Sequence, residues 1–366
     1  MANFDAAALA LKAVCPTNDL LYDDKGLPSV MVYIPKFKLS DVIAGASDST
    51  HPAFIVNGTE IDGFWVSKYQ NIMQDSRAYS LPCEDPKASI NFDTARTYCE
   101  NKGDGWHCMT RAEWAAIALW CLNNGFQPKG NNRYGRDDSD STYDGIPMTY
   151  GTGADAGKIY HIATGSGPIS YSHNNALSGI WDLNGNVNEW QGGIRLVKGE
   201  IQVLVNNNAA DADNSQAAAS AQWKAINAAA TGSNDLYLTP NGSGTTSGSV
   251  KLDYVSNHWQ WDTTISSQDD SSRSATFAST TCSGNISATA KELLYALCLM
   301  PASSTATDYS GDYFYANNGA DERAFYAGGS YSTGANAGVF YLSVNARSGT
   351  NPTVGFRSAY VDLPSA

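Results

Sequence analysis

The stretch from residue 179 to residue 190 constrains the fold of this chain more than any other part of its sequence. Its twelve residues include two tryptophans, three asparagines, two acidic residues and an Asn-Gly pair of the kind that forms a tight turn. Trp181 and Trp190 can each bury a large apolar area. The side-chain amides of Asn184 and Asn186 can bond loop backbone groups that no helix or strand satisfies. The stretch therefore predicts a scaffold element.

Length and composition limit the alternatives. With 366 residues, of which 42% are hydrophobic and 16% charged, the chain is predicted to be globular, with one large or two ordinary domains. The formal charge of −13 repels polyanions and no basic patch offsets it, so we expect no nucleic-acid partner. No apolar run is long enough to cross a bilayer, so we expect no membrane insertion. The seven cysteines are widely spread and odd in number, which favours buried thiols, or at most one or two disulfides, over a disulfide scaffold.

The chain is predicted to begin with an N-terminal arm over residues 1–30, followed by one domain over residues 31–366. The arm has helical spacing from Asp5 to Val14. It lacks a basic region at its start and Lys12 interrupts its apolar stretch, so we expect no secretory signal. In the domain, residues 62–69 are typical of a strand.

Two helices are indicated by the residues that precede them. Asp93 is a candidate cap for a helix over residues 94–102. Thr110 and Glu113 have the spacing of a capping box, which predicts a second helix that continues to Gly125.

Residues 200–300 differ in composition from their surroundings and are interpreted as a large insert. The insert begins with a β-prone stretch near Ile201 and continues with an alanine-rich segment over residues 215–229 that favours a helix. A further helix is predicted over residues 291–300, with Pro301 as its stop. The insert has no assigned role.

The common catalytic and metal-binding motifs are missing from the sequence. The acidic clusters at Asp137 and Asp269 lie in Ser-rich loops and are most simply solvated. His107 and Cys108 are adjacent, but no Cys-x-x-Cys accompanies them, so a structural zinc site is not expected. Neither a Gly-x-Ser-x-Gly elbow nor a phosphate-binding loop is found.

The 179–190 stretch resembles the signature of the formylglycine-generating-enzyme family, a branch of the C-type lectin fold. Other blocks resemble further motifs of that family in the same order along the chain. These blocks are Ile90–Ala95 with Tyr98 and Cys99, Met109–Trp114, Gly328–Tyr331, Ala346–Ser348 and Val354–Arg357. The resemblance covers residues 30 to 360 apart from the insert. It implies an α+β protein with a C-type lectin fold of the formylglycine-generating-enzyme subtype.

The resemblance leaves two interpretations of Asn186 and Glu189. In the first, they are ligands of a structural calcium ion, as oxygens near this motif are in enzymes of the family. In the second, they only hydrogen-bond the loop. No other cofactor is expected.

The resemblance also bears on whether this chain is an enzyme or a binding protein. The family's enzymes depend on a reactive cysteine pair near the closing Ala-Arg-Ser, and residues 339–348 of this chain contain no cysteine. Cys298 lies in the predicted helix over residues 291–300 and is expected in the core. A thiol mechanism needs an accessible thiolate, so we expect this chain not to be an enzyme. The alternative is an oxidase of the formylglycine-generating type, or a degenerate form of it.

The segment from Tyr326 to Thr353 has the composition of a binding surface. Arg347 is its only charged residue, and the rest is largely Ser, Thr, Asn, Tyr, Gly and Ala, which evolved paratopes also use. Alternation along a strand predicts that Phe340, Leu342 and Val344 face the core, while Tyr341, Ser343 and Asn345 face outwards.

Residues 334–340 also resemble the variable proteins of diversity-generating retroelements, in which adenine-directed mutagenesis randomises codons of such a segment. This resemblance implies a variable region over about residues 326–353, with exposed, diversified side chains. The implied ligand-binding positions are Tyr326, Ser330, Tyr331, Ser332, Thr333, Tyr341, Ser343, Asn345, Ser348, Gly349, Thr350, Asn351, Pro352 and Thr353. The implied fixed scaffold is Gly328, Gly329, Phe340, Leu342, Val344, Arg347, Phe356 and Arg357. The alternative is an ordinary solvated strand and turn.

The preferred hypothesis is therefore a hypervariable ligand-binding protein that recognises a protein or glycan receptor on a target cell. It would be displayed on a phage tail or on a cell surface, and the missing secretory signal favours the virion. A tail protein would be an oligomer, for example a trimer, although the sequence has no coiled-coil heptads to support one.

Overall fold

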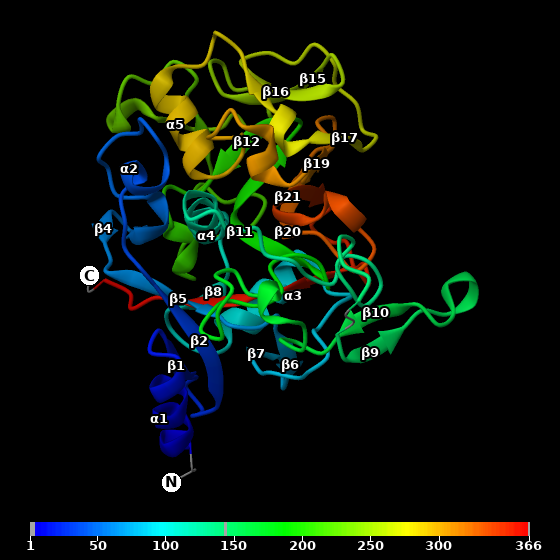
Figure 1. The fold of residues 1–366 in the computed structure, drawn as a ribbon. Helices are drawn as coiled ribbons and strands as arrows, with labels where there is room; N and C mark the ends of the chain where they lie inside the picture. The colour runs from blue at the N-terminus through cyan, green and yellow to red at the C-terminus, as the bar shows by residue number, and fades with distance from the viewer. Residues whose placement is uncertain (1–3, 143–144, 365–366) are drawn as a thin grey trace.

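The computed structural model describes residues 4–142 and 145–364, which form a mixed α and β fold (Figure 1). This confirms the predicted α+β class. The N-terminal helix α1 (Phe4–Val14) projects from one end of the molecule, and none of its residues is buried. Among the described residues, no helix has both the length and the apolar composition needed to cross a bilayer.

One sheet joins the two ends of the chain. Each of its strands is antiparallel to its neighbours, and the strand nearest the C-terminus pairs with two strands from the first third of the chain. Across the sheet the order is β1 (Asn18–Tyr22), β2 (Pro28–Pro35), β5 (Gly63–Ser67), β23 (Ser358–Tyr360) and β8 (Trp106–Cys108). The predicted strand over residues 62–69 is confirmed as β5.

A second, larger sheet contains most of the C-terminal half. Its main path runs through β17 (Arg273–Thr276), β19 (Tyr313–Ala316), β21 (Gly338–Asn345), β20 (Arg323–Gly328), β11 (Asn188–Val197), β12 (Glu200–Val203), β15 (Lys251–Val255), β16 (His258–Asp262) and β18 (Thr281–Cys282). Three further strands pair at its sides: β13 (Lys224–Ile226), β14 (Tyr237–Leu238) and β22 (Val354–Phe356). Residues 200–300 therefore extend the same sheet that holds β20 and β21.

The predicted helices form except the one over residues 215–229, and one of them has a different cap. Helix α4 (Arg111–Asn123) begins with the predicted capping box, in which Thr110 accepts from the Glu113 amide. Helix α3 (Phe92–Glu100) is capped by Asn91 and not by Asp93, because the Asn91 side chain accepts from the Thr94 amide at 2.8 Å. Asp93 lies inside the first turn. Helix α5 (Ala288–Ala296) begins and ends a few residues earlier than predicted.

The alanine-rich segment over residues 215–229 does not form the predicted helix. Residues 224–226 are strand β13, which pairs with β12 and β14. Trp223 is buried against Leu204 and Ala209 in a small separate cluster. The helix propensity of alanine is weak, and tertiary packing can override it. Here the pairing of β13 and the burial of Trp223 override it.

The remaining α-helix and β-strands are short. They are α2 (Leu39–Val42), β3 (Ile55–Val56), β4 (Thr59–Glu60), β6 (Ile72–Gln74), β7 (Arg77–Tyr79), β9 (Pro147–Tyr150) and β10 (Ile159–Ile162). Strands β9 and β10 form a two-stranded ribbon that extends from the side of the molecule (Figure 1). All seven cysteines are free thiols, and five of them are buried, as one of the two open alternatives predicted.

Candidate functional site

The 179–190 stretch forms a buried scaffold, as predicted. Trp190 is fully buried, and its indole Nε1 donates to the Ile90 carbonyl oxygen at 2.8 Å. The Asn186 side chain bonds both backbone groups of Ile162, since its Oδ1 accepts from the amide at 3.0 Å and its Nδ2 donates to the carbonyl oxygen at 3.1 Å. The Asn184 Nδ2 donates to the Pro128 carbonyl oxygen at 2.9 Å.

A buried ion pair ties this scaffold to the C-terminal strand. Arg357 donates through Nε to Oε2 of Glu189 and through Nη2 to Oε1, both at 2.8 Å. Arg357 also donates to the carbonyl oxygens of Ser67 and Trp181. Such a bidentate pair with further hydrogen bonds is the geometry in which a buried charge pair is tolerated.

Asn186 and Glu189 do not fit a calcium site. Both oxygens of Glu189 accept from the Arg357 guanidinium, and Oδ1 of Asn186 accepts from Ile162 and from Asn131. Protein donors therefore already fill these acceptor positions. In the described part of the chain, no group of three or more His, Cys, Asp or Glu side chains is arranged to hold a metal ion. The hydrogen bonds favour the second interpretation, in which both residues support the loop.

The strand predicted to carry the binding face is present, but its outward side chains are not exposed. Strands β20 and β21 pair with Tyr326 opposite Ser343. Phe340, Leu342 and Val344 lie in the main core as predicted. The predicted exposure is wrong for Tyr341 and Ser343, which are only 7% and 5% exposed.

The outward face of β21 is buried because other tyrosine side chains pack nearby. The Tyr341 ring lies 5.7 Å from the ring of Tyr315 on β19, and Tyr326 packs edge-on against Trp190 at 5.3 Å. Burial raises the pKa of the Tyr341 hydroxyl, with nearby Tyr326 as a lesser cause. This face is therefore a packed aromatic layer, so Tyr341 and Ser343 belong to the frame.

Tyr331 and Ser330 are also buried, at 4% and 3% exposure, which corrects the predicted exposure of Tyr331. The Tyr331 ring stacks on the Tyr160 ring with their centroids 4.3 Å apart. Burial raises the pKa of Tyr331 to about 12. Tyr160 belongs to the ribbon of β9 and β10. Nothing in the sequence of this ribbon predicts that it would cover Tyr331.

Two loops of the segment remain at the surface. Loop A comprises residues 330–337 and loop B comprises residues 346–353. Among the predicted binding positions, Ser332, Ser348, Thr350, Asn351 and Pro352 are exposed, and Tyr326, Thr333, Asn345, Gly349 and Thr353 are half-buried. Apart from Arg347 neither loop contains a charged residue.

The backbone conformation of loop A is fixed by two glycines and one side-chain hydroxyl. Gly328 and Gly329 have φ angles of 91° and 80°, in the left-handed region that favours glycine. A Cβ on Gly329 would lie 2.5 Å from the Ala337 side chain, so only glycine fits there. The Thr333 hydroxyl then accepts from the Ser330 amide at 2.8 Å and closes the turn.

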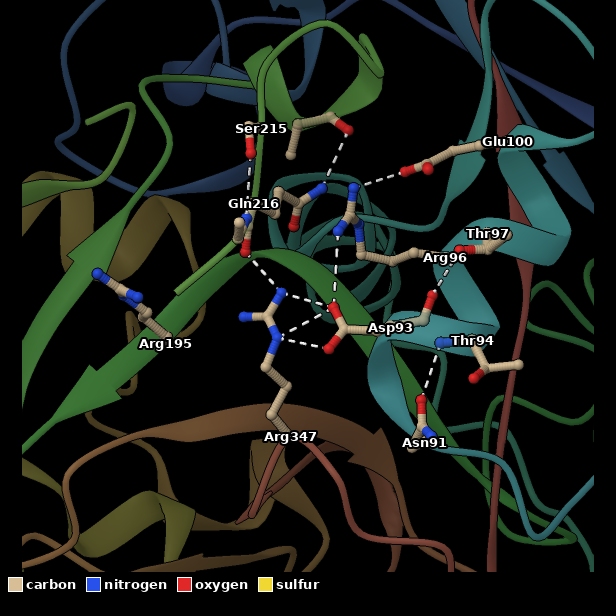
Figure 2. A network of polar contacts seen from close by, with 12 residues as sticks. Asn91, Asp93, Thr94, Arg96, Thr97, Glu100, Arg195, Ser215, Gln216 and Arg347 are labelled. Atoms are coloured by element: carbon tan, nitrogen blue, oxygen red, sulfur yellow. Dashed lines mark hydrogen bonds and ion pairs between the residues drawn. The ribbon is translucent and has the colours of Figure 1, made fainter. Parts of the chain in front are cut away.

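Loop B is held by Arg347, which acts as the predicted frame residue. Figure 2 shows its guanidinium facing the Asp93 carboxylate and Gln216. Arg347 donates from Nε and Nη2 to Asp93, with shortest distances of 2.7 Å, and from Nη2 to the Gln216 carbonyl oxygen at 2.6 Å. The guanidinium carbon lies 4.9 Å from the Phe92 ring centroid. Gln216 belongs to residues 200–300, so that region braces loop B.

The two loops meet at His161. The His161 ring lies 5.6 Å from the Tyr331 ring of loop A, and its Nε2 lies 3.3 Å from the Pro352 carbonyl oxygen of loop B. On the other side, Nδ1 lies 2.8 Å from Oδ1 of Asp85. Sequence reasoning missed His161 and Asp85, because they are far from both loops in the chain and carry no motif.

A cleft of about 300 Å³ opens beside loop A. Asp137, Asp308, Asp312, Ala335 and Gly338 are among its lining residues. Asp137 was predicted to be solvated, but it is buried and accepts from the Gly130 amide and from the Ser139 amide and hydroxyl. The cleft gives loop A a concave border.

Two thiols of the C-terminal half, Cys298 and Cys282, are wholly or partly buried. Cys298 is buried in the main core as predicted, and burial raises its pKa to about 12. Burial likewise raises the pKa of the half-buried Cys282 to about 11. At neutral pH these two groups are thiols and poor nucleophiles.

No protein-family model matches this sequence, and no curated protein matches it. Several solved structures are similar to the chain, and two of them represent different kinds of protein. One is PvdO from Pseudomonas aeruginosa, at 12% identity and a TM-score of 0.36, covering 93% of this chain and 97% of that chain. The other is Treponema denticola variable protein 1, at 10% identity and a TM-score of 0.34, covering 94% of this chain and 99% of that chain. At these TM-scores, neither similarity assigns a function to this chain.

Proposed function

We propose that this chain is a ligand-binding protein and not an enzyme, and that loops A and B form its contact surface. The proposal includes a C-type lectin fold of the formylglycine-generating-enzyme subtype. The observation that carries it is that two almost uncharged loops, each with some exposed side chains, both contact the buried His161 while each is fastened to a buried frame. Exposed Ser, Thr and Asn side chains on a rigid support suit a contact surface that adapts by substitution.

Burial narrows the set of positions available to a ligand. Side chains such as Tyr331, Tyr341 and Ser343 are part of the packing, so changing them would disturb the fold. The positions free to vary are Ser332, Ser348, Thr350, Asn351 and Pro352. We propose that a retroelement diversifies these codons, and that the ligand is a protein or glycan receptor met by a phage tail or a cell surface.

The test of diversification compares sibling copies of the gene. We expect substitutions to be concentrated at the codons of the exposed positions, opposite adenines of a template repeat. Codons for buried residues such as Tyr341 and Ser343 should change far less. Even drift across residues 320–360 would contradict the proposal.

The test of binding uses an immobilised glycan array and cells of candidate hosts. A chain with Thr350→Asp and Asn351→Asp should lose retention on whichever surface captures the wild type. Thr264→Asp, at an exposed threonine of residues 200–300, is the matched control and should bind normally. The alternative, an oxidase of the formylglycine-generating type, would be supported by turnover of a cysteine-containing sulfatase peptide.

A further inference from the structure

Four oxygen atoms of the 179–190 stretch converge on one point inside the protein. They are the backbone carbonyl oxygens of Asp182, Gly185 and Val187 and Oε1 of Glu189, called here the oxygen ring. Left-handed φ angles of 64° at Asp182, 79° at Gly185 and 61° at Asn186 curl this loop tightly. Asp, Gly and Asn are the residues that adopt this conformation at least cost.

The side-chain amide of Gln70 occupies the oxygen ring. Its Nε2 lies 3.0 Å from the Asp182 oxygen, 3.2 Å from Gly185, 2.9 Å from Val187 and 3.1 Å from Glu189. An amide nitrogen has two hydrogens, so it cannot donate fully to four acceptors.

The orientation of this amide is fixed by its surroundings. Gln70 is fully buried, and its Oε1 has no hydrogen-bond partner among the described residues. Turning the amide round would place Oε1 against four other oxygens, which is worse than leaving it unpaired. The ring therefore selects a group with positive character.

Such a ring has the ligand chemistry of a hard cation. Ca²⁺ prefers carbonyl and carboxylate oxygens at about 2.3–2.6 Å, whereas the distances to Gln70 are those of N–H···O hydrogen bonds. The one carboxylate of the ring, Glu189, is already neutralised by Arg357. A neutral amide keeps this buried site balanced, and a dication would add uncompensated charge.

We propose that the Gln70 amide takes the place of a structural cation, so that the loop folds without metal. Vacating the ring would convert it into a site for a hard divalent cation such as Ca²⁺. This inference is independent of the ligand-binding function proposed for loops A and B.

Two substitutions test the proposal by opening the ring. Gln70→Ala removes the amide, and Gln70→Asp removes it and adds a carboxylate that helps to balance a dication. Gln127→Ala is the matched control, since Gln127 is exposed and its Nε2 donates to a single carbonyl oxygen, that of Thr307. Thermal unfolding is measured in EDTA and in CaCl₂, together with calorimetric titration of CaCl₂.

The wild type and the Gln127→Ala control should have the same Tm in EDTA and in CaCl₂. Both Gln70 variants should have a lower Tm than the wild type in EDTA. Gln70→Asp should regain about 3 °C or more in CaCl₂ and bind one Ca²⁺ per chain, and Gln70→Ala should regain less. A wild-type Tm that falls in EDTA would overturn the proposal. The proposal would also be overturned if CaCl₂ neither stabilised nor helped to fold the two Gln70 variants.

Discussion

The 179–190 stretch and loop B both carry asparagine and glycine outside helices, yet the protein uses their asparagines in opposite ways. Asn186 is fully buried and bonds residues 24 and 55 positions away in the chain. The Asn351 side chain is exposed, and among the described residues its Oδ1 accepts only from Thr353, two positions away.

This difference separates frame from contact surface on physical grounds. A buried amide must satisfy its donors and acceptor within the protein, so its position is fixed by distant partners and its loss leaves those partners unpaired. An exposed amide is satisfied by water or by a neighbour, so it can be exchanged at little cost. The same residue type is therefore irreplaceable in one loop and replaceable in the other.

The largest effect is expected from breaking the buried pair that anchors the frame. Arg357→Met leaves the Glu189 carboxylate buried without its partner and should lower the free energy of unfolding by about 3–5 kcal/mol. Denaturant unfolding measures this. Adding Glu189→Met in the same chain should recover part of the loss, because no unpaired charge remains. Lys38→Met, which breaks a solvent-exposed pair with Asp48, is the control and should leave the denaturation midpoint unchanged. An equal effect of Arg357→Met and Lys38→Met would show that the frame is not held by this pair.

A pair of matched substitutions compares the two loops directly. Asn186→Ala leaves both backbone groups of Ile162 unpaired and places alanine at a left-handed φ of 61°, so it should lower the free energy of unfolding by about 3 kcal/mol. Asn351→Ala should change it by less than about 0.5 kcal/mol. Chemical denaturation of both variants under the same conditions measures the difference. Similar losses in the two would remove the distinction between frame and surface.

Features fixed by neighbours in the chain could be predicted from the sequence. The Thr110 capping box and the core-facing alternation of Phe340, Leu342 and Val344 depend on residues only a few positions apart. The burial of Tyr341 could not be predicted, because its cover comes from Tyr315 on another strand. For the same reason alternation gave the correct inner face of β21 but the wrong exposure for its outer face.

The candidate site was likewise predicted in part. The polar composition of loop B could be read from the segment itself, and the family resemblance implied that Arg347 belongs to the fixed scaffold. His161, where the loops meet, and Gln70, which fills the oxygen ring, lie far from their partners in the chain and carry no motif. Only the fold brings them into place.

The smallest expected effect concerns two histidines, one in the frame and one between the loops. His173 is buried in the frame, and its Nδ1 accepts from the Ile180 amide at 2.8 Å. Burial lowers the pKa of His173 to about 3, with smaller contributions from Lys68 and Arg357. The folded protein therefore keeps His173 neutral, while the unfolded chain takes up a proton near pH 6.5. His173 thus contributes stability that is present above pH 6.5 and is lost as the pH falls towards 3.

Between pH 7 and pH 5 this loss should be about 2 kcal/mol, measured by denaturant unfolding at each pH. His173→Asn keeps an acceptor near Ile180 and cannot be protonated, so it should flatten that part of the slope. The remaining slope should include His51, since burial also lowers its pKa, to about 4. His161→Asn is the matched control at the junction of the loops, and it should retain the slope that His173 produces. If the slope is unchanged in His173→Asn, then the frame does not hold a neutral imidazole there, and the contrast between a fixed interior and an adaptable surface fails at this residue.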